Sequence, residues 1–311
     1  MAAIGIVRPG SQHGLVHSAE LVAGVLETAG HDVHRHDLAN EPSKDLVFDV
    51  VILFERIVDH WLGLAEHTVL IPNPEWFRDE FVDLLGGIDV VFAKTHDAVA
   101  AFESRGCVVV YTGFTSRDQF LPGVERSLGR WLHVAGGNQQ KGTNTIVEVW
   151  TANPEFPQLT IVHTPPVTLR LSPPPNVWVL ADYLPGPIVQ FLQNRSGVHV
   201  CPSEAEGWGH SIVEGLSVGA VVLTTDAPPM NEVVHPDRGS LCAYTTSTPQ
   251  RFGRAYYVSP DMLEATVRAT LERDTDELLE LGRRAREWYL ENDAAFARRL
   301  TAAVDDLTGA S

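Results

Sequence analysis

Two glutamates in a glycine-containing stretch are the residues of this chain best suited to chemistry. Glu206 and Glu214 are separated by seven residues in the segment CPSEAEGWGHSIVEGL, which begins at Cys201. A step of eight residues returns to nearly the same face of a helix, so both carboxylates can face one ligand. A carboxylate accepts two hydroxyl hydrogen bonds at once, which suits recognition of a sugar. The alternative interpretation is a solvated helix start with two surface glutamates, because this spacing often arises by chance.

Backbone N–H groups between the two glutamates add a second feature. Gly207 and the segment 209–211 (Gly, His, Ser) stand where an apolar run, 197–200, ends and an amphipathic helix begins. A second apolar run, 220–223, follows, so the order is strand, loop, helix, strand. Helix N-termini at the carboxyl ends of strands bind anions in open α/β sheets. The pattern therefore indicates a site for a diphosphate.

A lysine in another loop after a strand repeats this arrangement. The predicted strand 131–135 is followed by a glycine-rich loop, 136–142, that contains Lys141, and then by a predicted helix, 143–151. A lysine in such a loop cradles phosphate. The alternative is a solvated loop lysine, but two loops with the same chemistry favour a functional role.

The elements that must position these loops form two α/β series. The first has predicted strands at 3–7, 33–36, 48–54, 68–71, 89–93 and 108–111, with helices at 16–29 and 97–105. The segment 114–130 has no clear period and is interpreted as a linker. The second series continues with strands at 159–163 and 177–180 and a helix at 188–193, and the chain is helical from Asp261 with breaks near Asp274 and Asn292. Alternating strands and helices predict two doubly wound sheets with a cleft between them.

Composition excludes several classes of protein. The 311 residues carry a net charge of -17 and are 44% hydrophobic, which allows two full cores but disfavours a nucleic-acid-binding surface. Three widely spaced cysteines without a CxxC motif favour a reducing compartment, and we expect a cytoplasmic protein. The N-terminus shows no signal-peptide pattern, and no stretch of the sequence predicts a membrane span. Neither a DxD motif at a strand end nor a histidine cluster with ligand spacing is present, so no metal is expected.

The segment PSEAEGWGHSIVEGLSVGAVVLTT resembles the donor-site signature of the retaining GT-B glycosyltransferases of family 4, also called group 1. The segment WLHVAGG followed by Lys141-Gly142-Thr143 resembles the opening of their C-terminal domain. The resemblance implies a GT-B fold, with two Rossmann-like doubly wound domains facing a central cleft. Residues 1–120, completed by a C-terminal helix at about 293–311, would form the acceptor domain, and residues 121–292 would bind the donor.

The resemblance also implies a metal-independent hexosyl transfer from a UDP- or GDP-sugar, with retention of configuration and no cofactor. Glu206 would contact the donor sugar and Lys141 would neutralise the departing diphosphate, and these two residues are the expected catalytic pair. Glu214 would bind the ribose. Asn138 stands where the family has an arginine, and either Arg170 or a residue of the N-terminal domain would substitute for it. The remaining expected donor contacts are Gly137, Leu184, Gly209, His210, Ser211 and Glu232.

Candidates for the acceptor side follow the strands of the first series. His13 and Gly14 lie in the first glycine-containing loop, Glu55 and Lys94 each follow a strand, and Glu75 and Trp76 lie in a Pro-rich turn. Trp76 would either stack against a sugar or lie in the core beneath that turn. For His13 and Glu55 the alternatives without a functional role are a histidine in a turn and a glutamate in an ion pair.

Two rival functions stay open at this point. One is a nucleotide-sugar epimerase of the same architecture, and the other is a non-catalytic GT-B module that binds sugar or nucleotide. The absence of the expected arginine at Asn138 motivates the second. The acceptor and the oligomeric state are not indicated by the sequence.

Overall fold

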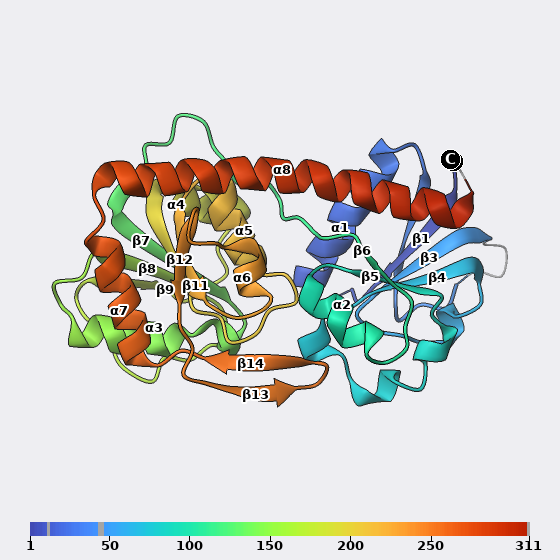
Figure 1. The fold of residues 1–311 in the computed structure, drawn as a ribbon, viewed down its shortest axis with the longest axis horizontal. Helices are drawn as coiled ribbons and strands as arrows, with labels where there is room; N and C mark the ends of the chain where they lie inside the picture. The colour runs from blue at the N-terminus through green and yellow to red at the C-terminus, as the bar shows by residue number, and fades with distance from the viewer. Residues whose placement is uncertain (11–12, 43–46, 310–311) are drawn as a thin grey trace. The chain divides into compact units, whose positions relative to one another are not determined.

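The chain divides into two compact units, which are described separately (Figure 1). The computed structural model describes residues 1–10, 13–42 and 47–309. Unit 1 comprises Met1–Ser116, Pro249–Arg254 and Asn292–Ser311, and unit 2 comprises Arg117–Thr248 and Ala255–Glu291. The segment 114–130, predicted to be a linker, is therefore shared, because residues 114–116 belong to unit 1 and the remainder to unit 2.

Unit 1 contains a six-stranded sheet in the order β2-β1-β3-β4-β5-β6. Every pair of neighbouring strands is parallel. The strands are β1 (Ala3–Arg8), β2 (Asp32–Asp37), β3 (Phe48–Phe54), β4 (Ala65–Ile71), β5 (Val90–Ala93) and β6 (Val109–Tyr111). The central strands β3 and β5 are apolar and almost entirely buried, as expected for a parallel sheet that is covered on both faces.

Alternate side chains of these strands point to opposite faces of the unit 1 sheet. One face carries a core that includes Val51, Leu53, Leu70 and Phe102, the last from α2 (His96–Glu103). On this side lie the short 3₁₀ helices η1 (Asp59–Trp61), η2 (Pro74–Trp76), η3 (Asp79–Phe81) and η4 (Leu85–Gly87). Helix α1 (His13–Thr28) packs against β1 and β2. Helix α1 begins within the segment that was predicted to be a loop, so His13 and Gly14 lie in its first turn.

Unit 2 also contains a six-stranded sheet, in the order β12-β11-β10-β7-β8-β9, and its neighbouring strands are again parallel. The strands are β7 (Ser127–Gly136), β8 (Gln158–His163), β9 (Val177–Leu180), β10 (Ser196–Cys201), β11 (Val221–Thr225) and β12 (Gly239–Cys242). The helices are α3 (Thr143–Ala152), α4 (Gly186–Arg195), α5 (His210–Ser217), α6 (Met230–Val233) and α7 (Pro260–Leu271), with the 3₁₀ turn η5 (Gln139–Lys141).

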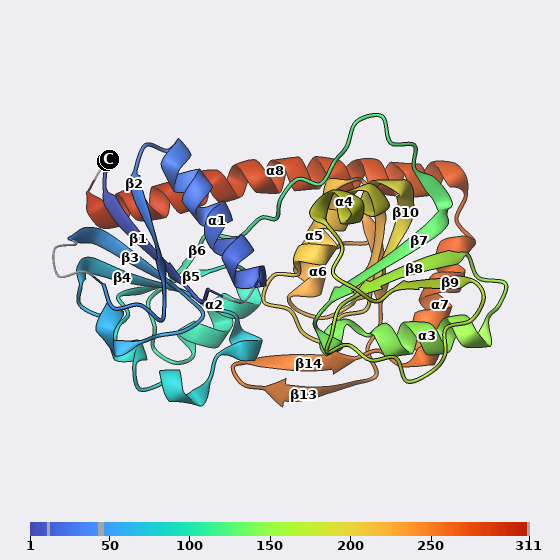
Figure 2. The same cartoon turned by 180° about the vertical axis from the view of Figure 1, so that it is seen from behind.

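The two faces of the unit 2 sheet are covered by different helices (Figure 2). Val198 and Val200 of β10 share a core with residues of α3 and α7. His199, between them, faces the other way, where a Cβ on Gly215 of α5 would lie 2.7 Å from its ring. Helix α5 can approach β10 and β11 closely because residue 215 is a glycine. This close approach sets the position of the α5 N-terminus at the end of the sheet.

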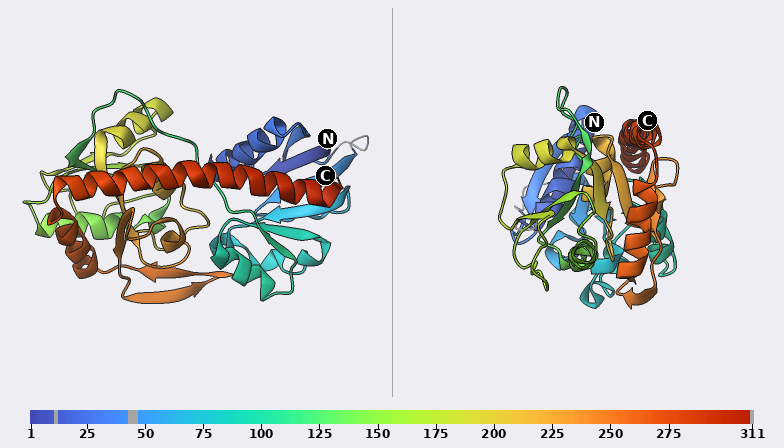
Figure 3. Two further views of the ribbon diagram at one scale, coloured as in Figure 1. Left: turned by 45° about the horizontal axis from the view of Figure 1, so that its top comes forward. Right: turned by 90° about the vertical axis from the view of Figure 1, so that its left-hand side faces the viewer.

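Two features of the structure differ from the sequence prediction. The predicted helix break near Asn292 is wrong, because α8 (Thr275–Thr308) is continuous over 34 residues (Figure 3). The Asn292 side chain donates to the Phe114 carbonyl at 2.8 Å, and this contact holds a weak helix former inside the helix. The prediction also missed the hairpin β13 (Thr246–Gln250) and β14 (Gly253–Tyr257), whose tip, 249–254, belongs to unit 1.

Candidate functional site

The residues that the sequence selected in unit 2 meet at the carboxyl edge of its sheet. Loop 136–142 follows β7 and loop 202–209 follows β10, and these two strands are neighbours in the sheet. Parallel neighbours end at the same edge, so the two loops lie side by side. A backbone hydrogen bond from Glu204 N–H to the Gln140 carbonyl, 2.8 Å long, joins them directly.

Lys141 and Glu206, one from each loop, form an ion pair between Nζ and Oε1. Their side chains are only 13% and 9% exposed, so water screens the pair weakly. The two residues that were expected to be catalytic are therefore brought together. Since an ammonium has three N–H donors, Lys141 can hold Glu206 and still donate to a second anion.

Gly142 allows the two loops to approach. Its φ is 70°, a left-handed conformation, and a Cβ at this position would lie 2.4 Å from the Pro202 carbonyl oxygen. Any side chain would be both strained and in collision with the neighbouring loop. The glycine after Lys141 thus fixes how closely the lysine loop lies to the loop that carries Glu206.

A buried histidine, which the sequence interpretation missed, connects the two segments that carry these loops. His133 of β7 lies 2.6 Å from the Val200 carbonyl through Nδ1 and 2.8 Å from the Thr143 hydroxyl through Nε2. Because a carbonyl oxygen can only accept, Nδ1–H donates to Val200 and Nε2 accepts from the Thr143 hydroxyl. Burial lowers the pKa of His133 to about 4, with Lys141 contributing in the same direction, so the ring is neutral at pH 7. The only sequence signal was a polar residue within an apolar strand.

The N-terminus of α5 presents groups suited to an anion. Gly209 precedes the helix with φ 88°, and His210 and Ser211 are its first residues. The Ser211 hydroxyl is buried and, within the described part of the chain, has no hydrogen-bond partner. A buried polar atom without a partner loses stability unless a ligand or water satisfies it. A phosphate at the helix N-terminus would do so.

Glu214 lies on α5 but already has two protein partners. Gln193 Nε2 donates to one of its oxygens at 2.8 Å, and Gln119 Nε2 lies 3.5 Å from the other. Burial raises the pKa of Glu214, and the hydrogen bonds from these amides oppose that shift. Gln119 and Gln193 were not foreseen, because nothing in the sequence links positions 119 and 193 to a helix that begins at residue 210.

The other expected donor contacts lie at the same edge with different local roles. Asn138 caps η5, because its side-chain oxygen accepts from Gln140 N–H at 2.9 Å, and it brings no charge to the site. Burial raises the pKa of Glu204, and the exposed Arg170 opposes that shift. Gly137 is exposed, Leu184 is half-buried in the loop after β9, and Glu232 is half-buried in α6, which follows β11.

In unit 1 the sheet edge carries a buried polar network. Asn73 Nδ2 donates to Glu55 Oε2 at 2.6 Å, and Lys94 Nζ donates to Asn73 Oδ1. The three residues follow β3, β4 and β5, which are neighbouring strands. Burial lowers the pKa of Lys94 to about 8, opposed by Glu75 and Glu55, and burial raises the pKa of Glu55. Glu55 also adopts a positive φ of 64°, a strain that clusters at functional sites.

The remaining unit 1 candidates have mixed surroundings. Glu75 is buried, whereas Trp76 is 43% exposed and is not a core residue. Gly14 is exposed. The side chain of His13 and all of Ser11 and Gln12 lie outside the described residues, so the first glycine-containing loop is known only at its ends.

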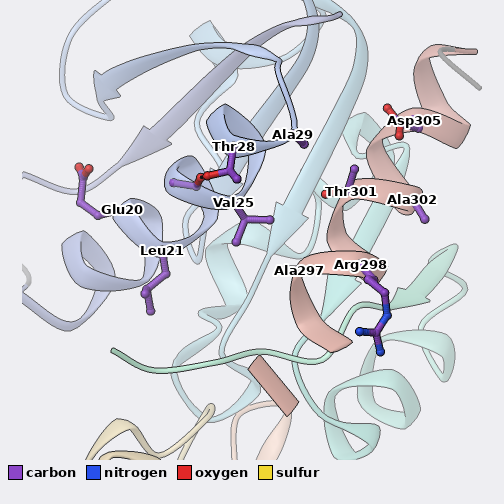
Figure 4. A pocket seen from close by; sticks show the side chains of 11 residues that line it. Glu20, Leu21, Val25, Thr28, Ala29, Ala297, Arg298, Thr301, Ala302 and Asp305 are labelled. Atoms are coloured by element: carbon purple, nitrogen blue, oxygen red, sulfur yellow. Dashed lines mark hydrogen bonds between the residues drawn. The ribbon is translucent and has the colours of Figure 1, made fainter. Parts of the chain in front are cut away.

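A separate groove in unit 1 contains none of the predicted residues. It lies between α1 and α8, has a volume of about 740 Å³, and is lined by residues that include Leu21, Val25, Ala297 and Ala302 (Figure 4). Among the described residues no three His, Cys, Asp or Glu side chains are grouped so that they could hold a metal ion. Within the described ranges no helix combines the length and apolar character needed to cross a bilayer.

Comparison with solved structures identifies the class of fold. Sucrose-phosphate synthase of Thermosynechococcus elongatus superimposes with a TM-score of 0.72 at 13% identity, with 100% of both chains covered. A glycosyltransferase of Rickettsia africae gives 0.72 at 14% identity over 98% of both chains. HepE of Anabaena, solved with UDP and glucose, gives 0.68 at 14% identity over 100% of both chains. The fold is GT-B, so the predicted class of two Rossmann-like α/β domains is confirmed.

One segment of the chain also matches a family model. The family model for glycosyl transferases group 1 matches residues 178–255, which run from β9 through loop 202–209 and α5 to β14. No curated protein sequence matches the chain significantly. The fold is GT-B, and the segment 178–255 is similar to the group 1 glycosyl transferases, which supports glycosyl transfer as the class of activity.

Proposed function

We propose that the protein transfers a sugar from a nucleotide-sugar donor to an acceptor hydroxyl, with retention of configuration and without a metal. The observation that carries this proposal is the Lys141–Glu206 ion pair, which lies beside the N-terminus of α5. The pair offers a positive charge for a diphosphate and a carboxylate for a sugar within one small site. The matched group 1 segment includes Glu206 and all of α5.

In this proposal the diphosphate of the donor is held by three kinds of group. Lys141 donates from the N–H groups that Glu206 does not use, the backbone N–H groups at 209–211 point toward the anion, and the Ser211 hydroxyl gains its missing partner. Gly137 and His210 border the same loops. Stabilising the negative charge of the departing diphosphate is the largest contribution that such a site makes to the rate.

The remaining parts of the donor fit around this centre. Glu206 accepts hydroxyl hydrogen bonds from the donor sugar. Glu232 of α6 adds a second carboxylate to this part of the site. Glu214 accepts the ribose hydroxyls with the lone pairs that Gln193 and Gln119 leave open, because each carboxylate oxygen accepts two bonds. Leu184 borders the base. HepE was solved with UDP, so a UDP-sugar is the first donor to test and a GDP-sugar the second.

Retention follows from a front-face displacement. The bond from the anomeric carbon to the diphosphate oxygen breaks, and the acceptor oxygen bonds to that carbon on the same face. The acceptor proton passes to the departing diphosphate oxygen, so no protein base is required. Lys141 and the helix N-terminus supply the positive charge that the diphosphate needs, and the proposal therefore includes no metal or cofactor.

The acceptor is assigned to unit 1, at the carboxyl edge of its sheet. His13, Gly14, Glu55, Glu75, Trp76 and Lys94 are the proposed residues, and Asn73 joins them because it bonds both Glu55 and Lys94. Residues 1–116, with the C-terminal part of α8, would form the acceptor domain and unit 2 the donor domain.

A thermal-shift panel of UDP-, GDP- and ADP-sugars tests the proposal, since a ligand that binds only the folded state raises its melting temperature. We expect one nucleotide class to stabilise the wild type and to lose this effect in Lys141→Met. Turnover of that donor, followed as nucleotide release, should fall in Glu206→Gln. A protein that binds the nucleotide sugar but never releases nucleotide with any acceptor would instead be a non-catalytic module, which the uncharged Asn138 favours.

A further inference from the structure

The turn after β4 carries a large aromatic side chain that is exposed although the rest of the turn is buried. Trp76 is 43% exposed, while Pro74, Glu75 and Phe77 are buried. Arg78 and the next two residues, Asp79 and Glu80, are also exposed and polar. The indole is therefore an exposed apolar surface followed in the chain by charged residues, in the turn after β4 at the edge of the sheet where α/β proteins bind ligands.

The buried network holds this turn at its first residue. Asn73 Nδ2 donates a hydrogen bond to Glu55, and Asn73 Oδ1 accepts one from Lys94, so both polar atoms of its side-chain amide are held. Lys94 in turn lies 5.2 Å from the centre of the Phe114 ring. Buried networks of this kind rigidify what they hold when their members are paired.

The tip of the β13–β14 hairpin holds the same turn from the other side. Phe252 N–H donates to the Pro74 carbonyl at 3.1 Å, and Gln250 Nε2 donates to the Glu75 carbonyl at 3.2 Å. A Cβ on Gly253 would lie 3.3 Å from the Glu75 nitrogen, so the two backbones pack closely. A segment about 175 residues further along the chain thus completes this part of unit 1.

Phe252 anchors the hairpin tip in the unit 1 core. Its ring centre lies 4.8 Å from that of Phe77 and 5.3 Å from that of Phe102. The Arg105 guanidinium covers it at 3.4 Å. Burial of this aromatic cluster stabilises the tip and, through it, the backbone that presents Trp76.

We infer that the turn 73–76 is a carbohydrate-binding acceptor subsite in which the Trp76 indole stacks against a sugar ring, with Asn73 and Phe252 as positioning residues. The inference rests on the proposed function and specifies its acceptor as a saccharide. A rigid indole offers a flat apolar face to the C–H groups of a pyranose at little entropic cost. An acyl chain would need a continuous apolar surface, whereas the exposed residues that come next in the chain after Trp76, 78–80, are charged.

Saturation-transfer NMR tests the inference with glucose, galactose, N-acetylglucosamine and maltose as probes, each added to protein saturated with UDP or GDP, whichever binds. We expect at least one probe to bind the wild type and Trp76→Ala to bind it about ten-fold more weakly. Trp76→Phe should stay within about three-fold of the wild type, because it keeps an aromatic face. The matched control is Trp178→Ala, which removes another exposed tryptophan, 55% exposed in unit 2, and should leave sugar binding unchanged.

The positioning role has a separate readout. Phe252→Ala should increase deuterium uptake in residues 72–78 and weaken sugar binding, while nucleotide affinity stays within about two-fold of the wild type. Failure of every probe to bind the wild type, or equal behaviour of Trp76→Ala and Trp178→Ala, would overturn the inference. Failure of the proposed function is distinguishable, because it appears as the absence of nucleotide-sugar binding in the wild type.

Discussion

Lys141 and Glu206 lie 65 residues apart in the sequence and form a mostly buried ion pair between two neighbouring loops of one sheet. Each residue satisfies the charge of the other while no ligand is bound. In the proposed donor site the pair is therefore assembled in advance, which would lower the reorganisation that a donor requires.

The first prediction concerns the coupling of these two residues. Lys141→Met and Glu206→Gln should each lower kcat/KM for the selected nucleotide sugar by about 10²–10³, because each removes a group that acts on developing charge. The double variant should fall by much less than the product of the two effects, because the residues act as one unit. Steady-state kinetics of the three variants measures this, with the exposed Glu277→Gln on α8 as control. Independent, multiplying effects would contradict the pairing.

The second prediction concerns the glycine between the loops. Gly142→Ala should destabilise unit 2 by considerably more than the ~1–2 kcal/mol of a left-handed alanine, since its Cβ would also collide with the Pro202 carbonyl. Gly123→Ala is the matched control, because Gly123 has φ 83° and open space around its Cα. Urea unfolding monitored by circular dichroism compares the two. Equal losses would mean that the loops separate freely.

The third prediction separates binding from stability at the start of α5. Ser211→Ala should not lower the melting temperature of the ligand-free protein, because removing a buried hydroxyl that has no partner within the described residues breaks no hydrogen bond. Its Kd for the nucleoside diphosphate should rise by about ten-fold, corresponding to a hydrogen bond to a charged group. Calorimetric titration measures the Kd. Ser203→Ala, which removes another buried hydroxyl that lacks a partner in the described chain, should likewise not lower the melting temperature and should leave the Kd unchanged.

The fourth prediction is an acid sensitivity set by two buried histidines. Burial lowers the pKa of both His133 and His199 to about 4. Between about pH 6.5 and 4 the unfolded chain binds protons that the folded chain does not, so the free energy of unfolding falls as the pH falls. Each histidine contributes up to about 1.4 kcal/mol per pH unit in that range.

Urea unfolding at pH 7, 6 and 5 gives the slope of this dependence. His199→Asn should unfold with a shallower slope than the wild type, because one of the two groups is gone. His133→Asn should also unfold with a shallower slope, because it removes the other buried histidine. An unaltered slope in His199→Asn would show that this residue is protonated in the folded protein.

Part of the site follows from local sequence alone. The apolar runs and the glycine-rich loops after them place Lys141 and Glu206 at strand ends, and parallel strands bring their ends to one edge. The same logic places Glu55, Asn73 and Lys94 at one edge of the other sheet. These relationships are local along each strand, so the order of residue types suffices to predict them.

Other relationships arise between segments that the sequence does not connect. Gln193 and Gln119 hold Glu214, and the hairpin tip at 249–254 holds the turn that carries Trp76. Neither contact has a periodic or motif signal, since each depends on where a distant loop lies after folding. The continuity of α8 through Asn292 has the same origin, because a tertiary hydrogen bond to Phe114 outweighs the weak helix propensity of asparagine.

The sequence by itself determined the fold class, the strand ends and the chemical types of the site residues, because hydrophobic periodicity and loop glycines act over a few residues. Only the tertiary structure decided which of those residues touch. It paired Lys141 with Glu206, engaged Glu214 with two glutamines, and left the Trp76 indole exposed above a buried network. The reason is physical: side-chain pairing depends on the packing of segments far apart in the chain, and propensity carries no information about that packing.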